Sequence, residues 1–394
     1  MKYKSSISLS GRESRGDGKN VGVVFPGYGY ERVCYALPVE KINYKQVYSL
    51  PIHRILKNNN FYKNTPIVFG HNIDLLHTWN AIPVSRHPFV VSFENELPRY
   101  FGKVPEWQKK LGYSLLNSDR CRGILAISDV AANLARNKMS EMGCTKIAEK
   151  IQVFRGGVNV ESAIYISPGP SFEGKTTLKL LFVGGDAFPK GFVPAFTALE
   201  ELVGNGASIH LTVIGGFKSG GYVLKGKSPD PLYWKNKIQN TEWVTHYDAL
   251  PNKNVIENMK RCDLFLFPSY DESLGWAVIE AGLLGVPSIT TNVFALPELV
   301  QHNMSGYVIN LNLGHQNRWQ GVWDNASGFE AELESANKAI YEGTKDAIIK
   351  IFQNPRLLGT WGRAAKVLLT ALYGVDTAAQ RLSVIYSDAL KGWK

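Results

Sequence analysis

Apolar residues along this chain gather in short runs separated by amphipathic stretches, and this alternation occurs twice. The first set of runs is NVGVVFP, TPIVFG, PFVVSF and GILAIS, and the second is LKLLFVGG, IHLTVIGG, WVTHY, CDLFLFPS and VPSITT. Nearly continuous apolar strands, each followed by a helical stretch, are typical of parallel sheets covered by helices on both faces. The pattern therefore predicts an α/β protein with two doubly wound domains.

The boundary between the domains is expected in ESAIYISPGPSFEGKTT, where prolines and glycines interrupt regular structure. We therefore expect one Rossmann-like domain over residues 1–165 and a second over residues 166–376. In the remaining segment, residues 377–394, apolar positions recur at helical spacing and predict a last helix over about 377–390.

Composition places the chain among globular proteins. It has 394 residues, of which 44% are hydrophobic and 20% charged. The first twenty residues lack the apolar segment of a signal peptide, and no run of about 18 apolar residues predicts a membrane span. Cys34, Cys121, Cys144 and Cys262 form no CxxC pair, which indicates reduced thiols rather than a disulfide framework or zinc site. We therefore expect a cytoplasmic protein.

Charge is distributed unevenly along the chain. The formal net charge is +10, and residues 1–160 hold 23 Lys and Arg against 12 Asp and Glu. A basic half of this kind attracts an anionic partner such as nucleic acid, acidic lipid headgroups or a phosphorylated substrate. A solubilising surface explains the same excess, and no nucleic-acid-binding motif accompanies it.

The stretch FPSYDESLGWAVIEAGLLGVPSITT holds the first candidate site. Ligands of open α/β sheets bind beyond the carboxyl ends of the strands, and here a buried strand ends at Pro268 before Gly275 opens a helix. The N–H groups of a helix start bind anions, and glycine allows a phosphate to approach. Glu272 and Glu280 could accept hydrogen bonds from sugar and ribose hydroxyls. They could also be an ordinary helix N-terminal acid and a solvated helix position.

These residues resemble the E-x7-E motif of the retaining family 4 glycosyltransferases, the glycosyl transferases group 1. LLFVGGDAFPKGF resembles the donor phosphate segment of that family, and VFRGGVNVESA resembles its hinge-side segment. ILAISDVAANLARNKM, CDLFLFPS and SGYVIN also fit, so the resemblance spans about residues 20–309. It implies the GT-B architecture, in which two Rossmann-like domains with parallel sheets face a central cleft. The first domain would bind the acceptor, the second the nucleotide sugar, and the last helix would pack on the first.

The resemblance also implies roles for single residues. Glu272 would contact the transferred sugar, Glu280 would hold the ribose, and Lys190 would neutralise the diphosphate, although a solvated loop lysine is the alternative. The remaining donor-binding candidates surround them: Gly184, Gly185, Ser273, Leu274, Gly275 and Trp276. A plain turn would also explain the glycine pair.

In the first domain, PFVVSFENELPRY resembles the strand after which the family often has a catalytic-cleft histidine. Glu94 stands there and would orient the sugar or the acceptor, or serve as a structural loop acid. GYGYER follows the first strand, so Gly27 is a donor-binding candidate and Tyr28 an acceptor-binding one. His77, in DLLHTWNAIP, is expected at a strand end as an acceptor-binding residue; a structural histidine is the alternative.

The chain also departs from the family pattern. Gly185 stands where many members have an arginine, so stabilisation of the leaving group would fall on Lys190 and the helix start, or on Arg155. Arg155 itself replaces a proline or asparagine, and it is a donor-binding candidate or a structural hinge residue. Glu298 matches the family, but the glycines that usually precede it are absent from FALPELV. These departures leave open whether activity is reduced.

The implied reaction moves a hexosyl group from a nucleotide diphosphate sugar to a hydroxyl of a glycan, lipid-linked or other acceptor, with retention, in polysaccharide or glycoconjugate biosynthesis. It needs no metal and no cofactor besides that substrate. The basic first domain suggests peripheral attachment to an anionic membrane surface at its inner face; nucleic acid is not an expected partner. The alternatives are a non-catalytic GT-B partner subunit and a nucleotide-sugar epimerase of the same architecture.

Overall fold

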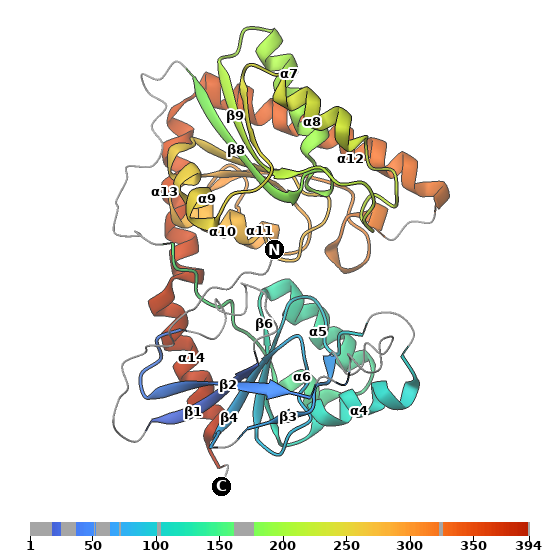
Figure 1. Cartoon of the computed structure of the whole chain (residues 1–394), viewed down its shortest axis with the longest axis vertical. Helices are drawn as coiled ribbons and strands as arrows, with labels where there is room; N and C mark the ends of the chain where they lie inside the picture. The colour runs from blue at the N-terminus through green and yellow to red at the C-terminus, as the bar shows by residue number, and fades with distance from the viewer. Residues whose placement is uncertain are drawn as a thin grey trace. The chain divides into compact units, whose positions relative to one another are not determined.

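The computed structural model describes residues 18–24, 37–50, 52, 64–70, 72–100, 104–160, 177–322 and 326–392. The chain divides into two compact units (Figure 1). Unit 1 comprises Met1–Val158 with Tyr373–Lys394, and unit 2 comprises Asn159–Leu372. Each unit is a Rossmann-like layer of largely parallel strands flanked by helices, so the prediction of two doubly wound α/β domains is confirmed.

Unit 1 is built on a seven-stranded sheet of order β3-β2-β1-β4-β5-β6-β7. All neighbouring strands are parallel except the pair β2 and β3, which is antiparallel. The strands are β1 (Lys19–Val24), β2 (Ile42–Ser49), β3 (Val68–Phe69), β4 (Leu75–Trp79), β5 (Phe89–Phe93), β6 (Cys121–Ala126) and β7 (Ile151–Val153). The central strands β4 and β5 are buried at every position, which explains their continuous runs of apolar and β-branched residues.

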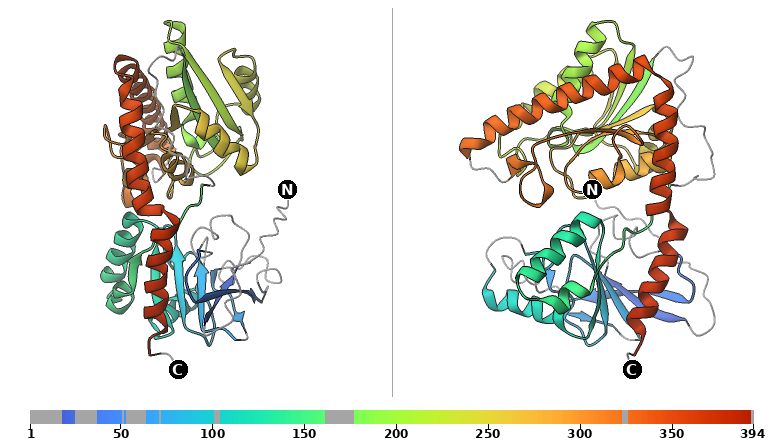
Figure 2. Two further views of the ribbon diagram at one scale, coloured as in Figure 1. Left: turned by 90° about the vertical axis from the view of Figure 1, so that its left-hand side faces the viewer. Right: turned by 180° about the vertical axis from the view of Figure 1, so that it is seen from behind.

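The helices of unit 1 are α4 (Glu106–Asn117), α5 (Asp129–Glu141), α6 (Thr145–Glu149) and the C-terminal α14 (Val375–Leu390). Figure 2 shows α14 running beside the strands of this unit. Its buried side chains include Leu382, Ile385 and Tyr386. The Arg122 guanidinium fixes its end, donating from Nε to the carbonyl of Ala389 at 3.0 Å. The last helix is therefore part of the same core as the first 158 residues of the chain.

Unit 2 contains a six-stranded parallel sheet of order β10-β9-β8-β11-β12-β13. Its strands are β8 (Leu178–Asp186), β9 (Ile209–Gly216), β10 (Val244–Tyr247), β11 (Leu264–Phe267), β12 (Ser288–Thr291) and β13 (Gly306–Ile309). The chain winds outward from β8 through β9 to β10, then returns to β11 beside β8 and winds the other way. The strand order therefore reverses between β8 and β11, which is the topological switch point of a doubly wound sheet.

Helices lie on both faces of this second sheet (Figure 2). They are α7 (Phe192–Gly204), α8 (Pro231–Gln239), α9 (Asn252–Arg261), α10 (Trp276–Leu283), α11 (Leu296–Leu299), α12 (Ala326–Gln353) and α13 (Arg356–Tyr373), with short 3₁₀ turns η1 (Phe188–Lys190), η2 (His315–Asn317) and η3 (Gln320–Val322). Aromatic side chains fill one layer: the Phe192 ring lies 5.1 Å from Phe182 of β8 and 5.4 Å from Phe196. This packing holds α7, and the loop before it, firmly on the sheet.

Candidate functional site

The switch point of unit 2 brings two loops together beyond the carboxyl ends of β8 and β11. The first loop carries Lys190, and the second carries Glu272. Tyr270 donates its backbone N–H to the carbonyl of Pro189 at 3.1 Å, which ties the loops directly. Gly191 adopts a left-handed φ of 72°, and a Cβ there would overlap the carbonyl oxygen of Pro268. Glycine is therefore required for this close approach.

Lys190 and Glu272 form an ion pair at this point. Lys190 Nζ lies 2.6 Å from Glu272 Oε2, and their side chains are 23% and 17% exposed. The ammonium also lies 3.5 Å from the carbonyl of Asp271 and 5.3 Å from the centre of the Phe267 ring. Glu272 Oε1 accepts from the N–H of Ser273 at 2.9 Å. The carboxylate is therefore held in place, and the ammonium keeps contact with solvent.

Helix α10 begins at Trp276, four residues after Glu272. Its N-cap, Gly275, has a left-handed φ of 96° and no side chain with which to cap the first turn. A Cβ at this position would lie 2.8 Å from Leu296 Cδ2, so packing as well as backbone conformation requires glycine. The positive end of the helix dipole and the Lys190 ammonium therefore belong to the same edge of the sheet, where negative charge is favoured.

Glu280 lies in the second turn of α10, facing the start of α9. Asn252 donates from Nδ2 to Glu280 Oε1 at 3.3 Å. Burial raises the pKa of the Glu280 carboxyl, and the hydrogen bond from Asn252 opposes this shift. A buried carboxylate is stabilised by further hydrogen-bond donors, and the hydroxyls of a ribose are such donors.

The other donor-binding candidates of unit 2 lie at or beside these loops: Gly184 and Gly185 near the end of β8, and Ser273 to Trp276 between Glu272 and the first residue of α10. A Cβ at Gly184 would lie 3.1 Å from Lys190 Cγ, whereas a Cβ at Gly185 would meet nothing within 4 Å. A larger side chain therefore has room at Gly185 and not at Gly184. Leu274 is 1% exposed, backbone and side chain together, so it offers almost no surface to a ligand, and Trp276 is half-buried.

In unit 1, Glu94 follows the carboxyl end of β5, where it was expected. Its carboxylate lies 3.1 Å from Arg99 Nη1, and its backbone N–H donates to Asn80 Oδ1 at 3.1 Å. Asn80 follows the neighbouring strand β4, so two polar residues meet at this edge of the sheet. A role of Glu94 toward sugar or acceptor stays a prediction.

His77 does not fit the acceptor-binding role that the sequence suggested. It lies in the middle of β4 and is 0% exposed. Nδ1 is 2.8 Å from the Tyr386 hydroxyl, and Nε2 is 2.8 Å from the Ser92 hydroxyl. Burial lowers the pKa of His77 to about 3. The prediction was wrong because the strand continues past His77, which instead links α14 to the sheet.

Arg155 follows β7 in unit 1, and its guanidinium pairs with Asp129 at the start of α5. The Arg155 side chain is 12% exposed. This pair suits the structural alternative, and a donor contact stays a prediction. Gly27 and Tyr28 lie outside the described residues.

A network that the sequence did not indicate adjoins the site. The Asp271 side chain is 2% exposed, forms an ion pair with Arg318, and accepts a hydrogen bond from the Tyr222 hydroxyl at 2.6 Å. Nothing in the sequence marks these three residues as neighbours, because they come from three separate loops.

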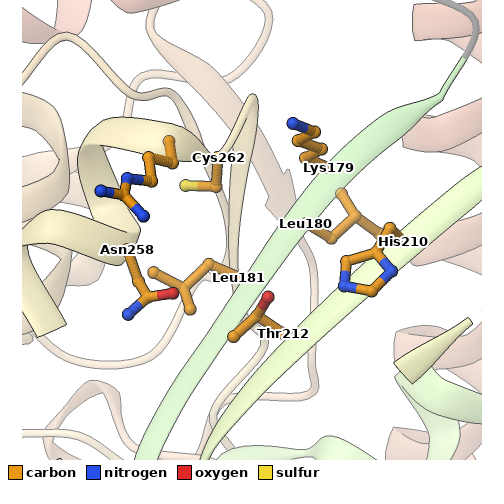
Figure 3. A pocket seen from close by; sticks show the side chains of 8 residues that line it. Lys179, Leu180, Leu181, His210, Thr212, Asn258 and Cys262 are labelled. Carbon is orange, nitrogen blue, oxygen red and sulfur yellow. The ribbon is translucent and has the colours of Figure 1, made fainter. Parts of the chain in front are cut away.

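A cavity of about 380 Å³ lies elsewhere in unit 2 (Figure 3). It is lined by Lys179, Leu180, Leu181, His210, Thr212, Asn258, Arg261 and Cys262. These residues come from the amino-terminal halves of β8 and β9 and from the end of α9. Because open α/β sheets bind ligands at the carboxyl ends of their strands, this cavity is separate from the candidate site.

Within the described ranges, no helix is long and apolar enough to cross a membrane. Among the same residues, no group of three or more His, Cys, Asp and Glu side chains is arranged to hold a metal ion.

Residues 168–316 match the model of the family Glycosyl transferases group 1. That segment contains both switch-point loops and α10, so the region with the candidate site is similar to this family, as its motifs predicted.

Parts of the chain are also similar to two bacterial proteins. Over 85 residues the chain is 38% identical to an uncharacterized 41.2 kDa protein in the cps region of Klebsiella pneumoniae, covering 22% of this chain and 23% of that protein. It is 27% identical over 192 residues, 47% of this chain and 43% of the relative, to the putative colanic acid biosynthesis glycosyltransferase WcaL of Escherichia coli. Each alignment thus spans less than half of the relative.

Solved structures show the fold over nearly the whole chain. A glycosyltransferase from Rickettsia africae has a TM-score of 0.60 at 16% identity, with 96% of this chain and 100% of that one covered. Anabaena HepE in complex with UDP has a TM-score of 0.59 at 13% identity, with coverage of 94% and 99%. At such identities the likeness establishes the fold, which is the GT-B fold of two Rossmann-like domains.

Proposed function

We propose that this protein is a retaining glycosyltransferase of family 4 that takes its sugar from a nucleotide diphosphate sugar. The observation that carries the proposal is the Lys190–Glu272 pair, 2.6 Å apart at the switch point and beside the start of α10. A cation and a helix N-terminus favour a diphosphate, and the adjacent carboxylate favours sugar hydroxyls. The match of residues 168–316 to the group 1 glycosyl transferases supports this assignment.

In this proposal each group has one task. Lys190 and the N–H groups at the start of α10 bind the diphosphate and stabilise the charge that develops on it as the sugar leaves. Lys190 exchanges its contact with Glu272 for the phosphate oxygens, at least in part. Glu272 then accepts hydrogen bonds from the sugar, and Glu280 accepts them from the ribose.

Transfer with retention then proceeds at the front face of the sugar. The bond from the anomeric carbon to the diphosphate oxygen breaks, the acceptor oxygen bonds to the same face, and the acceptor proton passes to the departing phosphate. Positioning and charge stabilisation lower the barrier, so neither a carboxylate nucleophile nor a metal is required.

Relatives narrow the choice of substrates. HepE has been solved with UDP, which makes UDP-linked sugars the first donors to try. WcaL and the amylovoran biosynthesis glycosyltransferase AmsK of Erwinia amylovora, 25% identical over 183 residues, suggest polysaccharide biosynthesis with a glycan or lipid-linked acceptor. The basic first half suggests an anionic membrane surface. Co-sedimentation with vesicles containing phosphatidylglycerol tests this, and failure to bind at low salt would argue against it.

A thermal-shift panel of UDP, GDP, ADP and dTDP tests the donor site. A ligand that binds only the folded state stabilises it by about 2.7 kcal/mol at a hundredfold excess over its dissociation constant. We expect one nucleotide to stabilise the wild type and to stabilise Glu280→Ala much less. Glu257→Ala is the matched control, because this glutamate is 44% exposed on α9 and pairs with Lys260 of the same helix. Equal shifts in all three proteins would place the nucleotide elsewhere.

The alternatives predict other outcomes. A non-catalytic partner subunit would bind a nucleotide without consuming a nucleotide sugar. An epimerase would convert the nucleotide sugar without an acceptor and leave the sugar on the nucleotide, which product analysis by chromatography would reveal.

A further inference from the structure

Asp271, the residue directly before Glu272, carries a charge that is almost completely buried. A carboxylate removed from water is costly unless charged and polar groups surround it. Asp271 has two such partners. Its Oδ1 accepts from the Arg318 guanidinium, and its Oδ2 accepts from the Tyr222 hydroxyl at 2.6 Å. The side chain is thus fixed from two directions.

The backbone of Asp271 is fixed as well, on the side that faces the donor site. Its carbonyl accepts from the Ser269 hydroxyl at 2.7 Å and lies 3.5 Å from Lys190 Nζ. Glu272 is the next residue and pairs with the same ammonium. A displacement of Asp271 would therefore move both members of the Lys190–Glu272 pair.

Arg318 reaches Asp271 from the loop that follows η2. It follows η2, where Gln316 and Asn317 adopt left-handed φ values of 61° and 56°. Its side chain is 10% exposed, and the guanidinium carbon lies 4.8 Å from the centre of the Phe294 ring. This ring and the ion pair leave the guanidinium little freedom, which suits a group that holds another in place.

Tyr222 reaches Asp271 from the segment 217–230, which joins β9 to α8 without regular secondary structure. Tyr222 is 70% exposed, so its ring contributes little to the packing of the core. The other end of the segment is attached to α12, since Lys227 pairs with Glu330 at 2.7 Å. The Tyr222 hydroxyl is therefore a direct contact between this segment and the loop that carries Asp271 and Glu272.

The phenol is suited to remain a hydrogen-bond donor. Burial of the hydroxyl and the charge of Asp271 raise the pKa of Tyr222, and Glu272 contributes in the same direction. Because Glu272 directly follows Asp271, the hydrogen bond from the phenol reaches the segment that carries the proposed sugar-binding carboxylate.

We propose that Tyr222 and Arg318 are positioning residues for the donor site: by holding Asp271 from both sides, they fix the geometry in which Lys190 and Glu272 meet the nucleotide sugar. This inference rests on the proposed function. Neither residue touches the reacting atoms in this account, and both act through Asp271.

Tyr222→Phe tests the proposal with little risk to folding, because the ring stays and is mostly exposed. We expect weaker binding of UDP, or of the nucleoside diphosphate that the panel selects, by about fivefold or more; this is less than the roughly tenfold or larger effect of one hydrogen bond to a charged group, because Tyr222 acts on the ligand only through Asp271. Tyr233→Phe is the matched control, a tyrosine on α8 that is 56% exposed. Isothermal titration calorimetry gives the affinities, and thermal unfolding checks that both variants fold.

Arg318→Lys and Arg318→Gln extend the test. Lysine keeps the positive charge but lacks the planar set of N–H groups of the guanidinium. We therefore expect Arg318→Lys to bind the nucleotide with an affinity between those of the wild type and Arg318→Gln. A merely structural role would reduce the active fraction of protein, and hence kcat per mole, without changing KM for the donor. Positioning instead raises KM and lowers kcat together in the folded fraction.

The outcomes separate this inference from the proposed function. If wild type binds a nucleoside diphosphate and Tyr222→Phe binds it equally tightly with an unchanged KM, the positioning role is refuted and the donor site stands. If wild type binds none of the four nucleotides, the donor site is refuted and the inference falls with it.

Discussion

Replacing Lys190 by alanine removes the cation on which the proposed donor site depends. Its side chain is 23% exposed and its ammonium lies 2.6 Å from Glu272, so the side chain is partly available to a ligand and held where the two switch-point loops meet. A charge-assisted hydrogen bond contributes about 2 kcal/mol, which corresponds to roughly a thirtyfold loss of affinity for the nucleoside diphosphate. The loss in kcat should be larger, about a hundredfold or more, because negative charge on the leaving group grows in the transition state.

Calorimetric titration of UDP, or of the nucleotide that the panel selects, measures the first quantity, and donor consumption under saturating conditions measures the second. Lys179→Ala is the matched control, because it removes the same charge from the first half of β8, beside the cavity of Figure 3. Folding should be little affected by either change, since both lysines are partly exposed. Wild-type affinity and turnover in Lys190→Ala would refute the reasoning.

Two further predictions concern stability. Because burial lowers the pKa of His77 to about 3 while the unfolded chain retains about 6.5, the unfolded state binds the extra proton first. The free energy of unfolding should then fall as pH drops from 6.5 toward 3, by up to about 1.4 kcal/mol per pH unit from this residue. Denaturant titrations at a series of pH values should show that the free energy of unfolding of His77→Gln depends less steeply on pH than that of the wild type; an unchanged pH dependence would contradict this. Gly191→Ala should cost more stability than Gly206→Ala, since both have positive φ (72° and 93°) but only Gly191 faces a clash, with Pro268; equal losses in thermal unfolding would contradict the account of the loop contact.

The apolar runs were enough to predict most of the second sheet. CDLFLFPS and VPSITT correspond to β11 and β12, which are buried at every position. Strands that are buried on both faces have nearly continuous apolar sequences and can therefore be predicted from them. The strand β2, INYKQVYS, was missed because most of its positions are only partly buried and polar residues interrupt its pattern. TPIVFG was predicted among the strands of a parallel sheet, yet its strand is only Val68–Phe69, which pairs antiparallel to β2, and Ile67 forms a single parallel bridge to Val84.

In the candidate site, too, some contacts could be predicted from the sequence and others could not. The resemblance to the group 1 glycosyl transferases brought Lys190 into one hypothesis with Glu272, although 82 residues separate them, and the structure places them in contact. The Asp271–Arg318 pair could not be predicted in this way. Arg318 lies in an irregular loop whose path depends on left-handed residues and on tertiary contacts, and no spacing rule connects it to Asp271. His77 was misassigned because an apolar strand gives no sign of where its buried part ends.

The most direct test of the central claim is the anomer that the protein releases from a donor whose sugar is α-linked. Slow hydrolysis of UDP-glucose, ADP-glucose or GDP-mannose, followed by proton NMR before mutarotation, reports both donor use and stereochemistry. The account predicts that the α-anomer appears first from one of these donors, and that Lys190→Ala abolishes its release. A β-anomer appearing first would contradict retention, and no nucleoside diphosphate released from any donor, with or without an acceptor glycan, would contradict the transferase itself.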